Sequence, residues 1–129
     1  MTRRTTLAAL AAALLLGVRA PPTSAQGFST ERFVEWCGDP ASDAWRKVGE
    51  QVCPSYIRGL IDGVKLQAIQ VAGLEGHRRV MGFCITEGVG AQDAIDAVLR
   101  YVEANPDSRR APAAATVYVA LAEAWPCPP

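Results

Sequence analysis

The chain has 129 residues, 50% of them hydrophobic, and its 13 basic and 13 acidic side chains leave no net charge at neutral pH. That length suits a single domain with one modest core. The balanced charge gives no electrostatic case for binding nucleic acid or an anionic membrane surface.

The N-terminus is typical of a secretory signal peptide. Two arginines precede an apolar run over residues 7–18, and a stretch of small residues closes at Ala25. A run of about a dozen residues is shorter than the ~20 that a membrane-spanning helix needs, so a membrane anchor is the weaker alternative. We predict a signal peptide over residues 1–25, export, and one domain over residues 26–129 with no stable membrane insertion. That domain holds 10 basic and 13 acidic side chains.

All four cysteines, Cys37, Cys53, Cys84 and Cys127, lie within the predicted domain. An even number of cysteines in a small exported domain indicates a disulfide framework. A zinc site is the alternative, but the sequence has no C-x-x-C motif, and its one histidine, His77, is not near a cysteine. We therefore expect two disulfides, and neither a metal nor a cofactor.

Helix signals begin directly after the predicted cleavage point. Ser29 fits the N-cap of a first helix, which Gly38-Asp39-Pro40 should end. Residues 41–52 are predicted to be helical in part, with Asp43 as a candidate cap.

A longer helix is expected to start at Pro54, because the N–H that proline lacks would be unpaired in a first turn. Gly59 and Gly63 lie four residues apart in it and each lowers helix stability by roughly 1 kcal/mol relative to alanine. Their spacing places them on one face, which predicts the close approach of another helix there.

Residues 72–90 contain five glycines and no clear period, which predicts a loop. A third helix is expected over residues 91–104 and a fourth over residues 113–125, with the breaking segment NPDSRRAP between them. The expected fold is all-α, a small bundle of about four helices stapled by two disulfides.

The predicted topology favours one of the three pairings that four cysteines allow. If the third and fourth helices form an antiparallel hairpin, their outer ends meet, and Cys84 and Cys127 lie at those ends. Cys37 and Cys53 flank a short link between two other helices. We therefore expect Cys37–Cys53 and Cys84–Cys127, whose loops of 17 and 44 residues would contribute about 3 and 4 kcal/mol by the chain-entropy relation.

No set of residues converges on catalysis. His77 could act as a general base, but a single histidine between Gly76 and Arg78 fits a solvated surface position better. Glu31 and Glu35 could form an acid/base pair, yet carboxylates at this spacing usually share one solvated helix face. With all cysteines paired, no thiol nucleophile remains. We predict no catalytic residue, and a binding protein rather than an enzyme.

Three cysteine contexts follow one another in order. In CPSYIRGLIDG (53–63), a cysteine precedes Tyr-hydrophobic-x-Gly and then Asp-Gly. Residues 82–107 carry Phe-Cys before a helix that ends in an aromatic residue, a glutamate and an x-Pro pair, and residues 111–128 run from Pro-Ala to aromatic-Pro-Cys. Over about 75 residues, this ordered set resembles the Rap/Tai family of type VI secretion immunity proteins. Thr86, Val102 and Trp125 depart from the family's usual proline, leucine and phenylalanine, and none of them touches the cysteine framework.

The resemblance implies a helical, two-disulfide periplasmic protein that binds and inhibits a secreted peptidoglycan amidase effector, protecting the producer and its kin. It also implies that a homodimer can form. A rigid, disulfide-stapled domain suits such a role because it loses little entropy on binding. The alternatives are a toxin-independent periplasmic binding or chaperone-like module and, less favoured, an undetected enzyme.

The predicted contact with the partner is the glycine-rich segment over residues 73–82. Its candidate side chains are those of Glu75, His77, Arg78, Arg79 and Met81. Functional residues concentrate on exposed loops that rigid elements position. We therefore expect this segment to enter or cover the groove of the amidase, whereas a solvated connector with no partner is the alternative.

Overall fold

Helices dominate the computed structural model, which describes residues 27–129. The predicted signal peptide lies outside these residues. The elements in chain order are α2 (Thr30–Cys37), α3 (Asp43–Val80), α4 (Ala91–Ala104), the 3-10 helix η1 (Pro106–Arg110) and α5 (Ala113–Ala124). The expected all-α fold is confirmed. No helix within the described range is both long enough and apolar enough to span a membrane.

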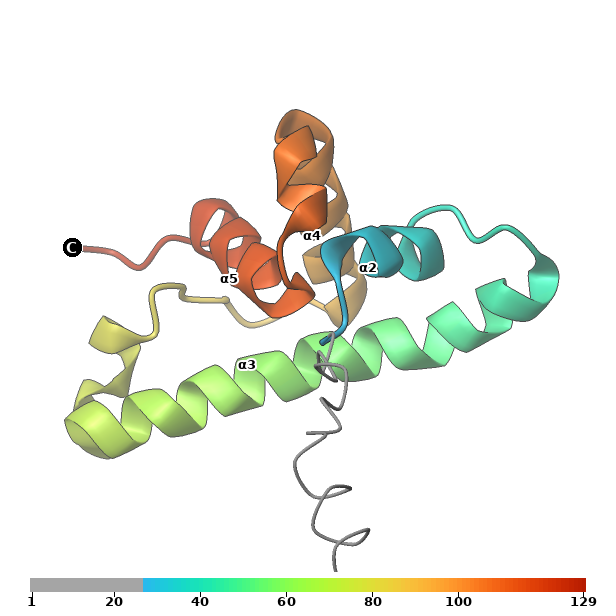
Figure 1. The fold of residues 1–129 in the computed structure, drawn as a ribbon. Coiled ribbons are helices and arrows are strands. Elements are labelled where there is room, and N and C mark those ends of the chain that lie inside the picture. Colours follow the sequence, from blue (N-terminus) through green and yellow to red (C-terminus); the bar gives the residue numbers. More distant parts are fainter. Residues whose placement is uncertain (1–26) are drawn as a thin grey trace, which may run out of the picture.

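α2 and α4 pack on one side of α3, α5 packs against α4 and α2, and the C-terminal part of α3 extends beyond the helices that cover its middle (Figure 1). The core lies where these helices meet. Its largest fully buried side chains are those of Phe33, Phe83, Ile57, Leu121, Val98, Val102 and Val117. Each of the four α-helices contributes to this core, so one hydrophobic cluster holds them together.

α2 begins and ends where the sequence predicted. The Ser29 hydroxyl accepts a hydrogen bond of 3.3 Å from the Arg32 N–H and so caps the first turn. At the other end, the Gly38 N–H donates to the Val34 carbonyl. Phe33 is fully buried and anchors the helix in the core.

A buried pair of hydroxyl groups joins the start of α2 to α5. Thr30 Oγ1 lies 2.8 Å from Thr116 Oγ1 and donates to the Ala111 carbonyl at 2.9 Å. The Thr30 N–H donates to the same carbonyl at 3.0 Å. Because both buried hydroxyls have partners, they position the two helices without the penalty of an unsatisfied polar group.

α3 starts at Asp43 rather than at Pro54, so the predicted start was wrong. Ser42 caps it instead of Asp43, and its hydroxyl accepts a bond of 3.4 Å from the Trp45 N–H. Pro54 therefore lies inside the helix, where it removes one backbone donor. The helix continues through this defect because its first turns are packed and covalently linked to α2 through Cys53.

The close approach of α2 occurs at Gly49, and the prediction of a helix against Gly59 and Gly63 was wrong. A Cβ at Gly49 would collide with the Trp36 carbonyl oxygen of α2. A Cβ at Gly59 or Gly63 would meet no atom within 4 Å, and both residues are exposed. The two glycines do share a helix face, but that face points to solvent.

The segment over residues 72–90 is not a loop throughout, which corrects the prediction. α3 continues to Val80 after an interruption at Gly73, where φ is 73° and ψ is 172°. Residues 74–80 thus form a short helical piece after the main body of α3, and only residues 81–90 lack helical structure. Glycine content alone suggested a loop, whereas a single glycine provides the break and the following residues return to helical geometry.

α4 spans the predicted residues 91–104. Its first turn is closed by the Gly90 N–H, which donates to the Asp93 carboxylate at 2.7 Å. η1 occupies the predicted break between the last two helices. α5 ends at Ala124, and the Trp125 N–H still donates to the Leu121 carbonyl.

The structure pairs Cys37 with Cys53 and Cys84 with Cys127, as the predicted topology favoured. The Cα atoms are 5.8 Å apart in the first pair and 4.8 Å apart in the second, within the usual range for disulfides. The first bond joins α2 to α3. The second joins the segment after α3 to the C-terminal tail.

Candidate functional site

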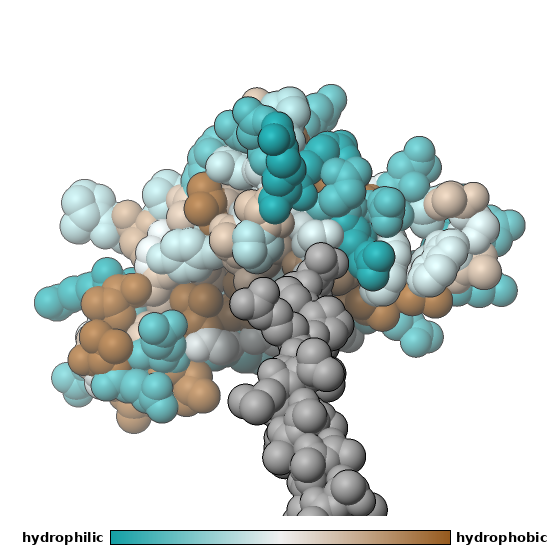
Figure 2. Space-filling view, viewed as in Figure 1, coloured by the Kyte–Doolittle hydropathy of each residue, from teal (hydrophilic) through white to brown (hydrophobic). Residues whose placement is uncertain are grey.

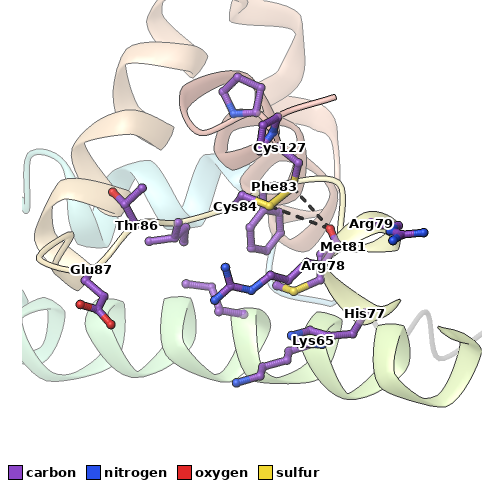
Figure 3. A pocket seen from close by; sticks show the side chains of 14 residues that line it. Lys65, His77, Arg78, Arg79, Met81, Phe83, Cys84, Thr86, Glu87 and Cys127 are labelled. Carbon is purple, nitrogen blue, oxygen red and sulfur yellow. Dashed lines mark hydrogen bonds between the residues drawn. A yellow bond between two sulfur atoms is a disulfide. The ribbon is translucent and has the colours of Figure 1, made fainter. Parts of the chain in front are cut away.

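An open groove of about 770 Å³ lies between α3, the segment that follows it and the C-terminal tail (Figure 3). It is lined by Ile61 and Lys65 of α3, by residues 77–79 at the end of α3, by Met81 and residues 83–87, and by residues 126–128 of the tail. Three separated parts of the chain, the middle of α3, residues 77–87 and the tail, therefore meet in one concave surface.

Two glycines with positive φ shape the walls of this groove. Gly73 has φ of 73° and interrupts α3, and Gly82 has φ of 80° and redirects the chain after it. A Cβ at Gly82 would also collide with the Tyr118 hydroxyl of α5. Glycine meets both requirements at residue 82, the backbone conformation and the close packing against α5.

The Cys84–Cys127 disulfide fixes the tail to the rest of the groove. The Cys84 N–H donates to the Trp125 carbonyl at 2.8 Å. Both sulfur atoms also contact the Arg78 carbonyl oxygen, at 3.9 Å from Cys84 and 3.5 Å from Cys127 (Figure 3). The disulfide and the Cys84–Trp125 hydrogen bond thus join the segment after α3 to the tail, and the end of α3 lies against the disulfide.

Cations dominate the charge of the groove. Lys65, Arg78 and Arg79 are exposed, and none of them takes part in the three ion pairs found within residues 27–129. Glu87 is the acidic residue of the lining. Figure 3 shows the Arg78 side chain reaching across the groove, whereas Arg79 extends away from it.

His77 has a structural contact at the edge of the groove. Its Nδ1 lies 2.6 Å from the Leu74 carbonyl oxygen. Because a carbonyl oxygen only accepts, Nδ1 is the donor of this hydrogen bond. The bond closes the helical turn after Gly73, so the ring helps to hold residues 74–80 in place.

Four of the five predicted contact residues line the groove, namely His77, Arg78, Arg79 and Met81. Glu75 is exposed and lies outside the lining. Whether any of them contacts a partner stays a prediction.

The sequence prediction missed Lys65, Glu87 and the tail. Lys65 is one exposed residue among many on a long helix, and no local pattern marks it. The tail could have been found, because the Cys84–Cys127 pairing places residues 126–128 beside residue 84.

The sulfur atoms of the groove are not free thiols. Cys84 and Cys127 are joined to each other, so neither can act as a thiol nucleophile. Elsewhere, Glu31 lies 3.3 Å from Arg109 in an ion pair, while Glu35 lines a separate shallow hollow. Among residues 27–129, no group of three or more His, Cys, Asp or Glu side chains could hold a metal ion.

A second surface feature is the uncovered end of α3. Leu66, Val71, Leu74 and Val80 have exposed fractions of 59, 72, 75 and 47%, and we refer to these four residues as the α3 end patch. Figure 2 shows hydrophobic side chains gathered over this end of the molecule. Clustered exposed apolar side chains mark interaction surfaces more often than isolated ones do.

A family model described as Rap1a immunity proteins matches residues 29–127. The match starts at the N-cap of α2 and ends at the last cysteine, so it covers all the described helices and both disulfides. No curated protein and no solved structure matches the chain significantly.

Proposed function

Since the chain belongs to the Rap1a immunity protein family, we propose that it is a periplasmic immunity protein that binds and inhibits a secreted peptidoglycan amidase. The family match over residues 29–127 is the observation that carries the immunity role. The signal-peptide pattern and the two disulfides support the periplasm, because disulfides persist in that oxidising compartment. A cell-wall amidase acts in the same compartment.

The proposed contact surface is the end of α3, with His77, Arg78 and Met81 on the groove side and with Arg79 and Glu75 beside them. Because residues 74–80 are helical and Arg78 lies against the disulfide, this surface meets the amidase as an ordered element and covers its cleft. A surface that is already ordered loses little conformational entropy on binding. Inhibition by coverage needs no catalytic residue from this chain.

The homodimer that the resemblance implies is assigned to the α3 end patch. Replacing Leu74, which is 75% exposed, by glutamate should abolish a dimer, because the charge would be buried in the contact. Val119→Glu on α5 is the matched control, since Val119 is 44% exposed and lies outside the patch. Sedimentation velocity measures the mass of both variants, and a monomeric parent chain would contradict the assignment.

The main experiment titrates the exported, oxidised chain calorimetrically against the product of the adjacent reading frame, with peptidoglycan amidase activity followed in parallel. We expect a nanomolar dissociation constant and loss of cleavage. No binding with both disulfides intact would contradict the immunity role and favour a toxin-independent periplasmic module. The intact mass of the exported protein tests cleavage after Ala25.

The contact surface has its own test in the same assay. Replacing His77, Arg78 and Arg79 by alanine should weaken binding at least tenfold, about 1.4 kcal/mol. Arg58→Ala with Arg100→Ala is the control, because both arginines are exposed and neither lines the groove. An unchanged affinity of the triple variant would end this assignment and leave the immunity role untouched.

A further inference from the structure

The groove combines unpaired cations with an apolar floor. Lys65 and Arg78 face it without a carboxylate partner among the described residues, while Ile61, Met81 and Ile85 form a half-buried floor over the buried Phe83. The domain as a whole carries more acidic than basic side chains. A concave cationic site on an acidic molecule is therefore a local feature and does not follow from overall composition.

We propose that this groove receives an extended segment of the effector protein that carries a carboxylate beside an apolar side chain. This proposal rests on the proposed immunity function and names the chemistry of the segment. The carboxylate pairs with Arg78 and Lys65, and the apolar side chain covers Met81 and Ile85. The tail residues Pro126 and Pro128 border the bound segment.

Arg78 is the residue best placed to recognise the carboxylate. Its guanidinium lies across the groove in Figure 3, and its planar fork can bind both oxygens of a carboxylate. Its backbone lies against the Cys84–Cys127 disulfide, because its carbonyl oxygen is 3.9 and 3.5 Å from the two sulfur atoms. An ion pair over an apolar floor is also less screened than one on an open surface.

Glu87 limits which segments can bind. It is the acidic member of the lining, so a second carboxylate placed near it would be repelled. A segment with one carboxylate at the Arg78 side and an apolar or basic side chain at the Glu87 side fits the charges best. Replacing Glu87 by glutamine should therefore relax this restriction and strengthen the binding of acidic segments in general.

A short peptide tests this chemistry without the effector. The probe is the N-acetylated, C-amidated peptide Ala-Asp-Leu-Ala, and Ala-Asn-Leu-Ala is its uncharged counterpart. Both are titrated into the isotopically labelled, exported chain and followed by backbone amide chemical shifts. We expect the aspartate peptide to shift groove amides with a dissociation constant of about 1 mM or tighter, and the asparagine peptide to bind at least tenfold more weakly.

Three variants locate the binding energy. Arg78→Glu should lower the affinity for the aspartate peptide at least tenfold, and Glu87→Gln should raise it. Arg100→Glu makes the same charge change on α4, which contributes nothing to the groove lining, and should leave the affinity unchanged. Because the probe is a peptide, these results do not depend on which amidase is the partner.

The outcomes separate the groove proposal from the immunity function. No groove shifts, equal binding of both peptides, or equal effects of Arg78→Glu and Arg100→Glu would each overturn the groove proposal. Response to vesicles containing phosphatidylglycerol but to neither peptide would overturn it in favour of a lipid surface. Effector inhibition that survives Arg78→Glu would also overturn it while the immunity function stands. Peptide binding without any inhibited amidase would instead overturn the immunity function.

Discussion

The two disulfides lie in unlike surroundings. Cys53 is only 2% exposed and belongs to the core cluster, next to the interface where Gly49 lets α2 approach α3. Cys84 and Cys127 are both half-buried and both line the groove. The same covalent bond therefore closes a packed interface in one region and shapes an accessible surface in the other.

The difference shows what each bond adds to contacts already present. At the first bond, burial of Phe33 and close helix packing already hold α2 on α3. At the second bond, a backbone hydrogen bond from Cys84 to Trp125 also joins the tail to the segment after α3. Loss of the first bond should cost stability, whereas loss of the second should cost stability and groove shape together.

The largest expected effect comes from removing each disulfide in turn. Cys84→Ala with Cys127→Ala opens the longer loop and should lower the free energy of unfolding by about 4 kcal/mol, and Cys37→Ala with Cys53→Ala by about 3 kcal/mol. Urea denaturation followed by tryptophan fluorescence measures both values. Only the variant without Cys84 and Cys127 should lose affinity for the aspartate peptide. An equal loss in both variants would contradict the view that only the Cys84–Cys127 bond shapes the groove.

Accessibility predicts the order of reduction. A reductant can reach both Cys84 and Cys127 from the groove, whereas in the other bond Cys37 is half-buried and Cys53 is buried. In mild dithiothreitol at neutral pH, we expect Cys84–Cys127 to be reduced at least tenfold faster, a difference of about 1.4 kcal/mol in activation free energy. Alkylation of the released thiols followed by peptide mass spectrometry identifies the pair. Simultaneous reduction would mean that global unfolding, and not local access, controls both bonds.

Glycine-to-alanine changes sharpen the comparison inside α3 itself. Gly49→Ala should lower the free energy of unfolding by about 1–2 kcal/mol, because the clash with the Trp36 carbonyl outweighs the gain in helix propensity. Gly63→Ala is the matched control on the same helix, where the open space leaves only the gain of up to about 1 kcal/mol. Thermal denaturation measures both. A stabilised Gly49→Ala variant would show that α2 does not pack there as described.

Local patterns in the sequence predicted much of the fold. The bounds of α2 and α4 followed from Ser29, from the stop at Gly38 and from regular apolar spacing, all of which act within a few residues. The cysteine pairing followed from the order of the helices. Helix caps and apolar spacing are determined by residues within one or two helical turns, so the local sequence is enough to predict them.

Features that depend on distant contacts were predicted less well. The predicted start of α3 was wrong because Pro54 has a local preference for a first turn, whereas contacts with α2 stabilise a helix that begins at Asp43. Gly49 and Gly63 look alike in sequence, and only the position of α2 tells them apart. The groove likewise needs Lys65, Arg78 and the tail together, and no local pattern joins them.

The smallest expected effect concerns Tyr56, which lies in α3 three residues after Cys53. Its ring packs against Phe28 and Phe33, with centroid distances of 5.0 and 6.0 Å. Burial raises the pKa of Tyr56 above its ordinary value of 10.0, because the phenolate form is poorly solvated there.

The sign of the pH dependence follows from this shift. The unfolded chain releases the Tyr56 proton near pH 10, and the folded chain releases it only at higher pH. The contribution of Tyr56 to stability is therefore fully present below pH 10 and is lost as the pH rises through the folded pKa. Tyr56→Phe keeps the ring and removes the hydroxyl, so it should flatten the fall in unfolding free energy above pH 10. Tyr101→Phe, outside this aromatic cluster, should leave that fall in place, and an equal flattening in both variants would assign the pH dependence to other groups.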